Sequence, residues 1–132
     1  MVQLLVNIDV PDVAAAEAFY TTAFDLTASR RFGGIVELRG GSSLIHLLPK
    51  AEGTVGAGDD KRRYERHWSP VHLDILVEDL DAAVERALAA GATLERRAPD
   101  AVWGRIANLA DPFGHGFCLI QLLNRGYDEL AG

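Results

Sequence analysis

Residues 73–80 read Leu-Asp-Ile-Leu-Val-Glu-Asp-Leu, and residues 6–13 read Val-Asn-Ile-Asp-Val-Pro-Asp-Val. An offset of 67 residues superposes the two stretches and places Asp12 on Asp79. Apolar residues alternate with other residues before each aspartate, which is typical of a half-buried strand. An alanine-rich segment with apolar residues at helical spacing follows each aspartate, and short strand-like runs come after it. The sequence therefore contains one strand–helix–strands unit twice.

The repeat predicts the ends and faces of its elements. Asp12 and Asp79 are expected to cap the two helices at their N-termini, and Gly91 is expected to end the second helix. Strand candidates after the helices are 27–32, 35–39 and 43–48 in the first copy and 93–97, 105–109 and 116–122 in the second. Residues predicted to pack between helix and sheet are Leu4, Val6, Ile8, Val10, Ala16, Phe19, Tyr20, Ala23 and Phe24, then Val71, Leu73, Ile75, Val77, Leu80, Ala83, Val84, Ala87 and Leu88.

These elements predict an α+β fold in which two tandem βαβββ modules form curved mixed sheets around a shared cavity. We expect one domain over residues 1–132. Its predicted parts are a first module over 1–48, a linker over 49–70, a second module over 71–123 and a C-terminal tail over 124–132.

Composition excludes several classes of function. The net charge is −6, and such an acidic chain lacks the basic surface that nucleic acids or anionic membranes require of a partner. The single cysteine, Cys118, allows no disulfide within the chain. Residues 1–7 do not resemble a secretion signal, and no apolar run is long enough to span a membrane. We therefore expect a cytoplasmic protein.

The faces of the strands turned away from the helices carry the candidate functional residues. In the first strand of each copy these are Leu5 and Asn7, and His72 and Asp74. The last strand of each copy can turn either of its two faces to the same side. For one of these two choices, His46 and Cys118 lie on the same side as Leu5 and His72. The predicted cavity then gathers Leu5, His46, His72 and Cys118.

The chemistry of these side chains suits a borderline metal ion such as zinc. The alternatives are that His72 is a hydrogen-bonded pocket residue and that Cys118 is a small buried apolar residue. Asp74 is expected to orient His72 or act as a base, or else to pair with an arginine. Trp103 is expected to line the cavity, and Arg105 is expected either to bind an anionic group of a substrate or to lie at the edge of the sheet.

Three segments carry a resemblance to a known superfamily. They are residues 10–20 (Val-Pro-Asp-Val-Ala-Ala-Ala-Glu-Ala-Phe-Tyr), residues 72–75 (His-Leu-Asp-Ile) and residues 111–120 (Asp-Pro-Phe-Gly-His-Gly-Phe-Cys-Leu-Ile). Together with the paired modules, they resemble the vicinal oxygen chelate superfamily of glyoxalases, bleomycin-resistance proteins and extradiol dioxygenases. The resemblance covers nearly the whole chain except the linker and the last residues.

The resemblance implies four metal-ligand positions, one on the first and one on the last strand of each module. They fall on Leu5, His46, His72 and Cys118. Leu5 has no ligand atom, and Cys118 stands where the superfamily has a carboxylate. The implied metal set is His46, His72 and Cys118, with zinc, nickel, manganese or iron as the candidate ion. Standard glyoxalase I activity is not expected.

Three functions follow from the resemblance as alternatives. The first is a metal-dependent lyase, isomerase or oxygenase, in which His72 and Asp74 are catalytic and Leu5, Asn7, Trp103 and Arg105 bind the substrate. The second is a metal-free protein that binds or sequesters an antibiotic or another small ligand. The third is metal-free acid–base catalysis by His72 and Asp74. Members of the superfamily usually form dimers, so we expect a homodimer.

Overall fold

The computed structural model describes residues 1–131 and divides into two compact units, one ending at Glu65 and the other beginning at Arg66. Each unit contains one α-helix and one four-stranded sheet. This confirms the predicted α+β fold of two modules. The boundary between the units lies inside the segment predicted as the linker.

The first unit contains β1 (Leu5–Val10), α1 (Val13–Phe24), β2 (Thr27–Phe32), β3 (Ile35–Arg39), β4 (Leu44–Pro49), β5 (Val55–Ala57) and β6 (Asp60–Lys61). The second unit contains β7 (Leu73–Leu76), α2 (Leu80–Ala90), β8 (Thr93–Arg97), β9 (Gly104–Ala110), β10 (Gly116–Leu122) and the 3₁₀ helix η1 (Gly126–Glu129). Every strand candidate of the two modules is therefore a strand in the structure.

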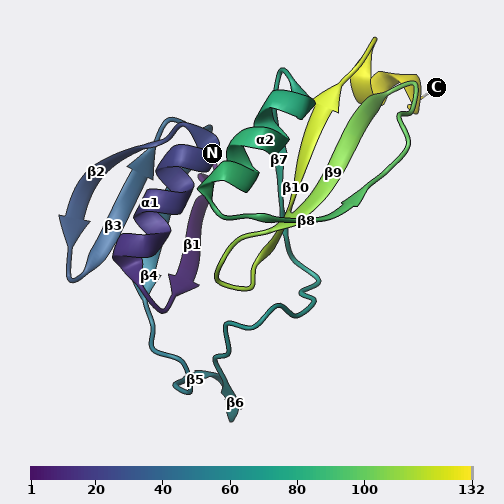
Figure 1. Ribbon diagram of the computed structural model, residues 1–132. Coiled ribbons are helices and arrows are strands. Elements are labelled where there is room, and N and C mark those ends of the chain that lie inside the picture. The colour runs from purple at the N-terminus through teal and green to yellow at the C-terminus, as the bar shows by residue number, and fades with distance from the viewer. Residues whose placement is uncertain (132) are drawn as a thin grey trace. The chain divides into compact units, whose positions relative to one another are not determined.

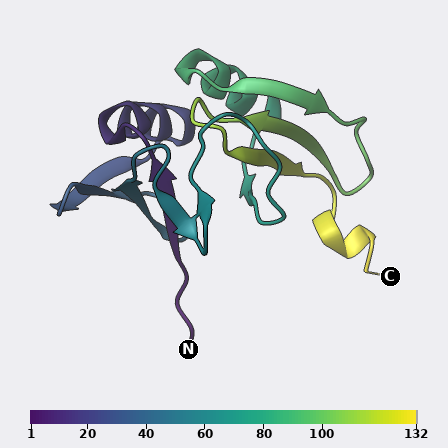
Figure 2. The same ribbon diagram turned by 90° about the horizontal axis from the view of Figure 1, so that it is seen from below.

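The two large sheets have the same topology, as Figure 1 shows for each unit. Their strand orders are β1-β4-β3-β2 and β7-β10-β9-β8. In each sheet the first strand is parallel to the last, and the remaining pairs are antiparallel. Figure 2 shows that each helix covers one face of its own sheet. The opposite face of each sheet carries the side chains that do not pack under the helix.

Both helices begin as the sequence predicts. The Asp12 side chain accepts a hydrogen bond from the Ala15 amide at 3.1 Å, and the Asp79 side chain accepts one from the Ala82 amide at 3.2 Å. These bonds satisfy amides that have no partner within the helix. The second helix ends at Gly91, whose φ of 119° is unfavourable for a residue with a Cβ atom.

Most of the predicted apolar stripe is buried between helix and sheet. Ala16, Phe19, Tyr20, Ala23, Leu80, Ala83, Val84 and Ala87 are all buried. The prediction that Leu88 lies in the core is wrong, because Leu88 is 41% exposed. Leu4 and Val71 are also exposed, since β1 begins only at Leu5 and β7 only at Leu73.

The segment predicted as a linker has structure of its own. The short strands β5 and β6 form a hairpin there. Arg62 donates a hydrogen bond from Nε to Asp9 Oδ2 on β1 at 2.9 Å, and the Tyr64 hydroxyl donates to the Lys50 carbonyl at 2.6 Å. These bonds attach the hairpin to the first unit. Within residues 1–131, no helix has the length and apolar character needed to cross a membrane.

Candidate functional site

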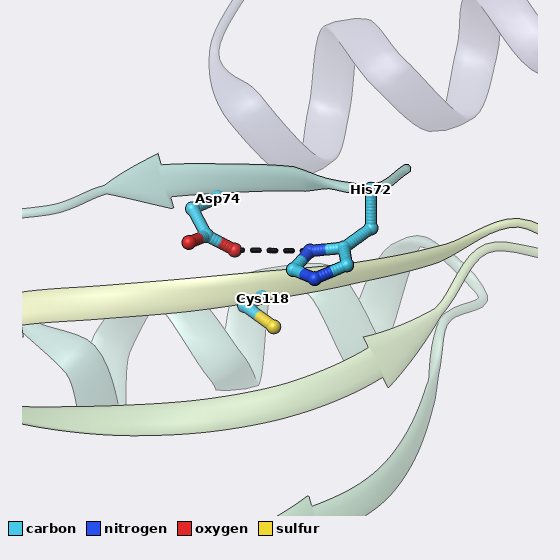
Figure 3. A group of neighbouring side chains, drawn as sticks. All are labelled: His72, Asp74 and Cys118. Atoms are coloured by element: carbon cyan, nitrogen blue, oxygen red, sulfur yellow. Dashed lines mark ion pairs between the residues drawn. The ribbon is translucent and has the colours of Figure 1, made fainter. Parts of the chain in front are cut away.

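The second unit brings His72, Asp74 and Cys118 together (Figure 3). Asp74 lies on β7 and is paired in register with Cys118 on β10, so both side chains leave the same face of the sheet. His72 immediately precedes β7 and lies two residues before Asp74. One potential ligand atom from each residue lies within 4.8 Å of the other two.

The three side chains differ in their access to solvent. The Cys118 thiol is buried, whereas the side chains of His72 and Asp74 are 48% and 45% exposed. His72 Nδ1 lies 3.2 Å from Asp74 Oδ1, and Asn108 on β9 donates a hydrogen bond to Cys118 Sγ at 2.9 Å. Burial, and then the negative charge of Asp74, raise the pKa of the Cys118 thiol. One side of the cluster is therefore closed by the sheet and the other side is open.

The donor set fits a borderline divalent cation. Imidazole, carboxylate and thiolate are all ligands of zinc and related ions. Three protein ligands leave a coordination position for water or a substrate, which is the arrangement of catalytic zinc sites. A bound cation also favours the thiolate over the thiol, which would offset the raised pKa of Cys118.

A pair of charged residues that sequence reasoning did not select as site residues lies close to this cluster. Arg66 binds Glu95 through Nε–Oε2 and Nη2–Oε1 contacts of 2.7 and 3.1 Å. The Arg66 guanidinium lies directly over Gly116, where a Cβ atom would come within 2.8 Å of Cζ. The charge of Glu95 also contributes to the raised pKa of Cys118. Glu95 follows Leu94 at an irregularity in the β8–β9 pairing, which the sequence does not reveal.

In the first unit, His46 belongs to a different polar group. The strand register places Asn7, His46 and Glu37 side by side across β1, β4 and β3. His46 Nε2 lies 2.9 Å from Glu37 Oε2. His46 lies in the first unit, whereas His72, Asp74 and Cys118 all lie in the second.

Glu37 is a functional candidate that the sequence analysis did not select as a site residue. Its carboxylate is completely buried and accepts hydrogen bonds from Ser29 Oγ at 2.9 Å, and from Arg30 Nε and Nη2 at 3.0 and 2.6 Å. These Arg30 bonds, followed by the bond from His46, hold the pKa of Glu37 far below its usual range. The available sequence signal was a single acidic residue inside the apolar run Ile-Val-Glu-Leu of residues 35–38.

The remaining predicted site residues have diverse surroundings. Leu5 is 50% exposed on β1 and is paired with Leu44. Trp103 stacks on Tyr127 of η1, with ring centroids 5.0 Å apart. Arg105 is bonded to Asp81 of α2 and to Asp100, so it lies on the face of the sheet that the helix covers. The structure does not bring Arg105 to the Cys118 face, because the two residues have opposite parity across β9 and β10.

Comparisons with known proteins agree with this architecture. The family model described as a glyoxalase-like domain matches residues 5–120. This chain belongs to that family. The family lies within the vicinal oxygen chelate superfamily, which the fold of two modules also supports.

Two curated proteins and one solved structure are similar to this chain. An uncharacterised protein of Mycobacterium bovis is 36% identical over 85% of this chain and 78% of its own length. The anthracycline biosynthesis protein DnrV of Streptomyces peucetius is 39% identical over half of this chain and 22% of its own length. The fosfomycin resistance protein FosX of Listeria monocytogenes, in complex with Mn(II) and a dihydroxypropylphosphonic acid, shares the fold with a TM-score of 0.66 and 20% identity. That likeness covers 90% of each chain.

Proposed function

We propose that this glyoxalase-like protein is a metal-dependent enzyme acting on a small molecule, with His72, Asp74 and Cys118 holding a divalent cation. The observation that carries the proposal is the convergence of imidazole, carboxylate and thiol donors within 4.8 Å on one sheet face. The Mn(II) complex of FosX adds support at the level of the fold, because FosX shares this architecture. Zinc is the preferred candidate ion, with nickel, iron and manganese as alternatives, because the set contains a sulfur ligand.

Each residue of such a site has a separate role. A bound divalent cation supplies Lewis-acid polarisation of a carbonyl or enolate oxygen. Asp74 Oδ1 lies 3.2 Å from His72 Nδ1 and orients the imidazole, which leaves Asp74 Oδ2 and His72 Nε2 as the atoms that would hold the cation. Asn108 holds the sulfur of Cys118 by a hydrogen bond, and the sheet shields that side from water. His72 and Asp74 remain exposed, so a substrate approaches from their side. This Lewis-acid chemistry accommodates lyase, isomerase and oxygenase reactions.

The experiment that tests the proposal is metal analysis of tag-free protein by inductively coupled plasma mass spectrometry. We expect about one ion per chain after reconstitution with zinc, and loss of that ion in His72→Ala and Cys118→Ser. His46→Gln is the matched variant, because it also removes an imidazole but lies outside this cluster. Retention of the ion in His46→Gln supports the proposed set, whereas its loss there favours the set of His46, His72 and Cys118.

Two results would contradict the metal proposal. One is absence of metal after reconstitution with zinc, nickel, manganese and ferrous iron. The other is unchanged metal content in both His72→Ala and Cys118→Ser. Catalytic turnover that survives complete removal of metal would instead favour acid–base catalysis by His72 and Asp74.

The second candidate function is binding or sequestration of a small ligand without metal. The raised pKa of Cys118 favours it, because a protonated thiol is a poor metal ligand. An exposed leucine at position 5, where the superfamily has a metal ligand, favours it as well. Native mass spectrometry of protein purified from its own cells distinguishes the two functions by showing either a metal ion or an organic ligand.

We further propose that the protein is a cytoplasmic homodimer. Each large sheet has two edge strands, β1 and β2 or β7 and β8, whose outer backbone groups need cover. Light scattering coupled to gel filtration measures the mass, and a single-chain mass would contradict the dimer. Cell fractionation tests the location.

A further inference from the structure

The polar group around Glu37 has surplus positive charge next to an exposed aromatic ring. Glu37 carries the one negative charge, and both Arg30 and Arg39 pair with it, at 2.6 and 3.5 Å. The Arg30 and Arg39 side chains are 65% and 58% exposed. After neutralisation of Glu37, one positive charge remains at the surface of the sheet. Such a surface favours an anionic ligand.

Arg30 retains donors for that ligand. Its Nε and Nη2 groups are bonded to the two oxygens of Glu37, which fixes the plane of the guanidinium. Arg30 also lies over the ring of Phe32, with Cζ 5.9 Å from the centroid. Nη1 is not used in the pair with Glu37, so it is able to donate to a carboxylate outside the protein.

His46 supplies an acceptor at the same place. The two oxygens of Glu37 accept bonds from Nε and Nη2 of the Arg30 guanidinium, so the carboxylate also accepts from His46 and the proton of the His46–Glu37 bond belongs to Nε2. In neutral His46 the other nitrogen, Nδ1, then carries a lone pair. Buried Glu37 thus selects the tautomer of His46 and leaves Nδ1 as an acceptor for a ligand hydroxyl.

Phe32 adds an apolar surface to this group. Its ring packs edge-to-face on His46 with centroids 5.3 Å apart, yet Phe32 is 43% exposed. A flat ring is the ligand shape that an exposed aromatic face beside a guanidinium accommodates. The anion donor, the hydroxyl acceptor and the apolar ring lie close together. Arg30 and His46 contact the same oxygen of Glu37, at 2.6 and 2.9 Å, and Phe32 packs on both of them.

We infer that the first unit binds a small aromatic hydroxy-carboxylate through Arg30, Arg39, Phe32 and His46, with Glu37 as the residue that positions Arg30 and His46. The ligand carboxylate pairs with the guanidinium groups, its ring lies against Phe32, and its hydroxyl donates to His46 Nδ1. This site needs no metal ion. Failure of the metal proposal therefore leaves it unaffected.

The test is calorimetric titration of metal-stripped protein with meta-hydroxybenzoate, whose hydroxyl is too far from its own carboxylate to bond with it. We expect saturable binding to one site per chain. Benzoate lacks the hydroxyl and should bind up to about tenfold more weakly, the worth of one net hydrogen bond. His46→Leu removes the acceptor and should abolish the preference for meta-hydroxybenzoate over benzoate, while Arg30 still bonds to Glu37.

Exposed charge variants test the anion contact. Arg39→Gln should weaken both ligands several-fold, because Arg39 is exposed and makes only the longer contact with Glu37. Arg31→Gln is the matched control on the neighbouring strand β2, since Arg31 pairs with Glu17 of α1 on the helix face. Phe32→Leu should also weaken both ligands.

Two outcomes would overturn the inference. The first is absence of saturable binding of meta-hydroxybenzoate to the wild-type protein. The second is an equal loss of binding in Arg31→Gln and Arg39→Gln, which would indicate attraction by net charge alone. If His46→Leu fails to fold, as seen by circular dichroism, the Arg39, Arg31 and Phe32 variants decide the question.

Discussion

Glu37 is a buried charge that the fold retains because donors from neighbouring strands surround it. Isolated burial of a carboxylate is strongly unfavourable, and a buried acid usually becomes protonated. Here Arg30, Ser29 and His46 all bond to it, so the charged form is the stable one. The pKa of Glu37 in the folded protein therefore lies well below its value in the unfolded chain.

This depressed pKa has a consequence for stability against acid. In the unfolded chain a glutamate has a pKa of about 4.3. As the pH falls, Glu37 therefore binds a proton in the unfolded state before it does so in the folded state. The contribution of Glu37 to the free energy of unfolding is complete above the unfolded-state pKa. It is lost as the pH falls through this region toward the folded-state pKa.

We expect Glu37→Gln to flatten the acid limb of the stability curve. Urea denaturation between about pH 2 and pH 7 measures it, as the change in free energy of unfolding with pH. Glu85→Gln, at an exposed position of α2, is the control and should keep the slope of the wild-type protein. An unchanged slope in Glu37→Gln would show that the Glu37 charge does not contribute.

At the scale of elements, β9 and β10 form the most extensive strand pair of the second unit and carry the Cys118 cluster. Their register runs without a break from Gly104–Leu122 to Ala110–Gly116. Gly104 is needed at one end of this register because a Cβ atom would lie 2.8 Å from the Gln121 carbonyl oxygen. That oxygen belongs to the backbone and is not free to move aside.

Gly104→Ala should therefore destabilise the second unit by about 1–3 kcal/mol, the usual cost of overpacking. Thermal and urea denaturation provide the measurement. Gly56→Ala is the comparison, since its added Cβ would make only ordinary contacts at 3.7 Å. Equal stability of the Gly104→Ala and wild-type proteins would mean that the two strands separate slightly without cost.

At the scale of the whole molecule, a metal ion that binds only the folded protein should stabilise it. The gain is about 2.7 kcal/mol when the free ion concentration is one hundred times the dissociation constant. For a chain of this size we expect zinc to raise the Tm by several degrees. Differential scanning calorimetry with and without zinc provides the measurement.

Cys118→Ser separates this effect from nonspecific binding to an acidic chain. Serine is nearly isosteric with cysteine but is a poor zinc ligand, so the variant should lose the rise in Tm. The net charge of −6 is the same in both proteins. If zinc still raises the Tm of Cys118→Ser, then zinc stabilises the protein by binding at other sites.

The sequence alone determined the architecture, because apolar periodicity and capping residues are local properties that repeat along the chain. The 67-residue repeat predicted both modules, and the Asp12 and Asp79 caps were confirmed by their hydrogen bonds. Alternation along the strands also offered the shared face of Asp74 and Cys118 as one of two choices, and the strand register decided it.

Only the tertiary structure decided which polar side chains meet. The bonds of Glu37 with Arg30 and His46 depend on pairing among three strands, and the Arg66–Glu95 pair joins residues far apart in the sequence. Arg105 points to the helix face because of its parity within β9, although its residue type suited an anion site equally well. Residue type states which chemistry is available, whereas strand register and side-chain direction determine which groups are close enough to use it.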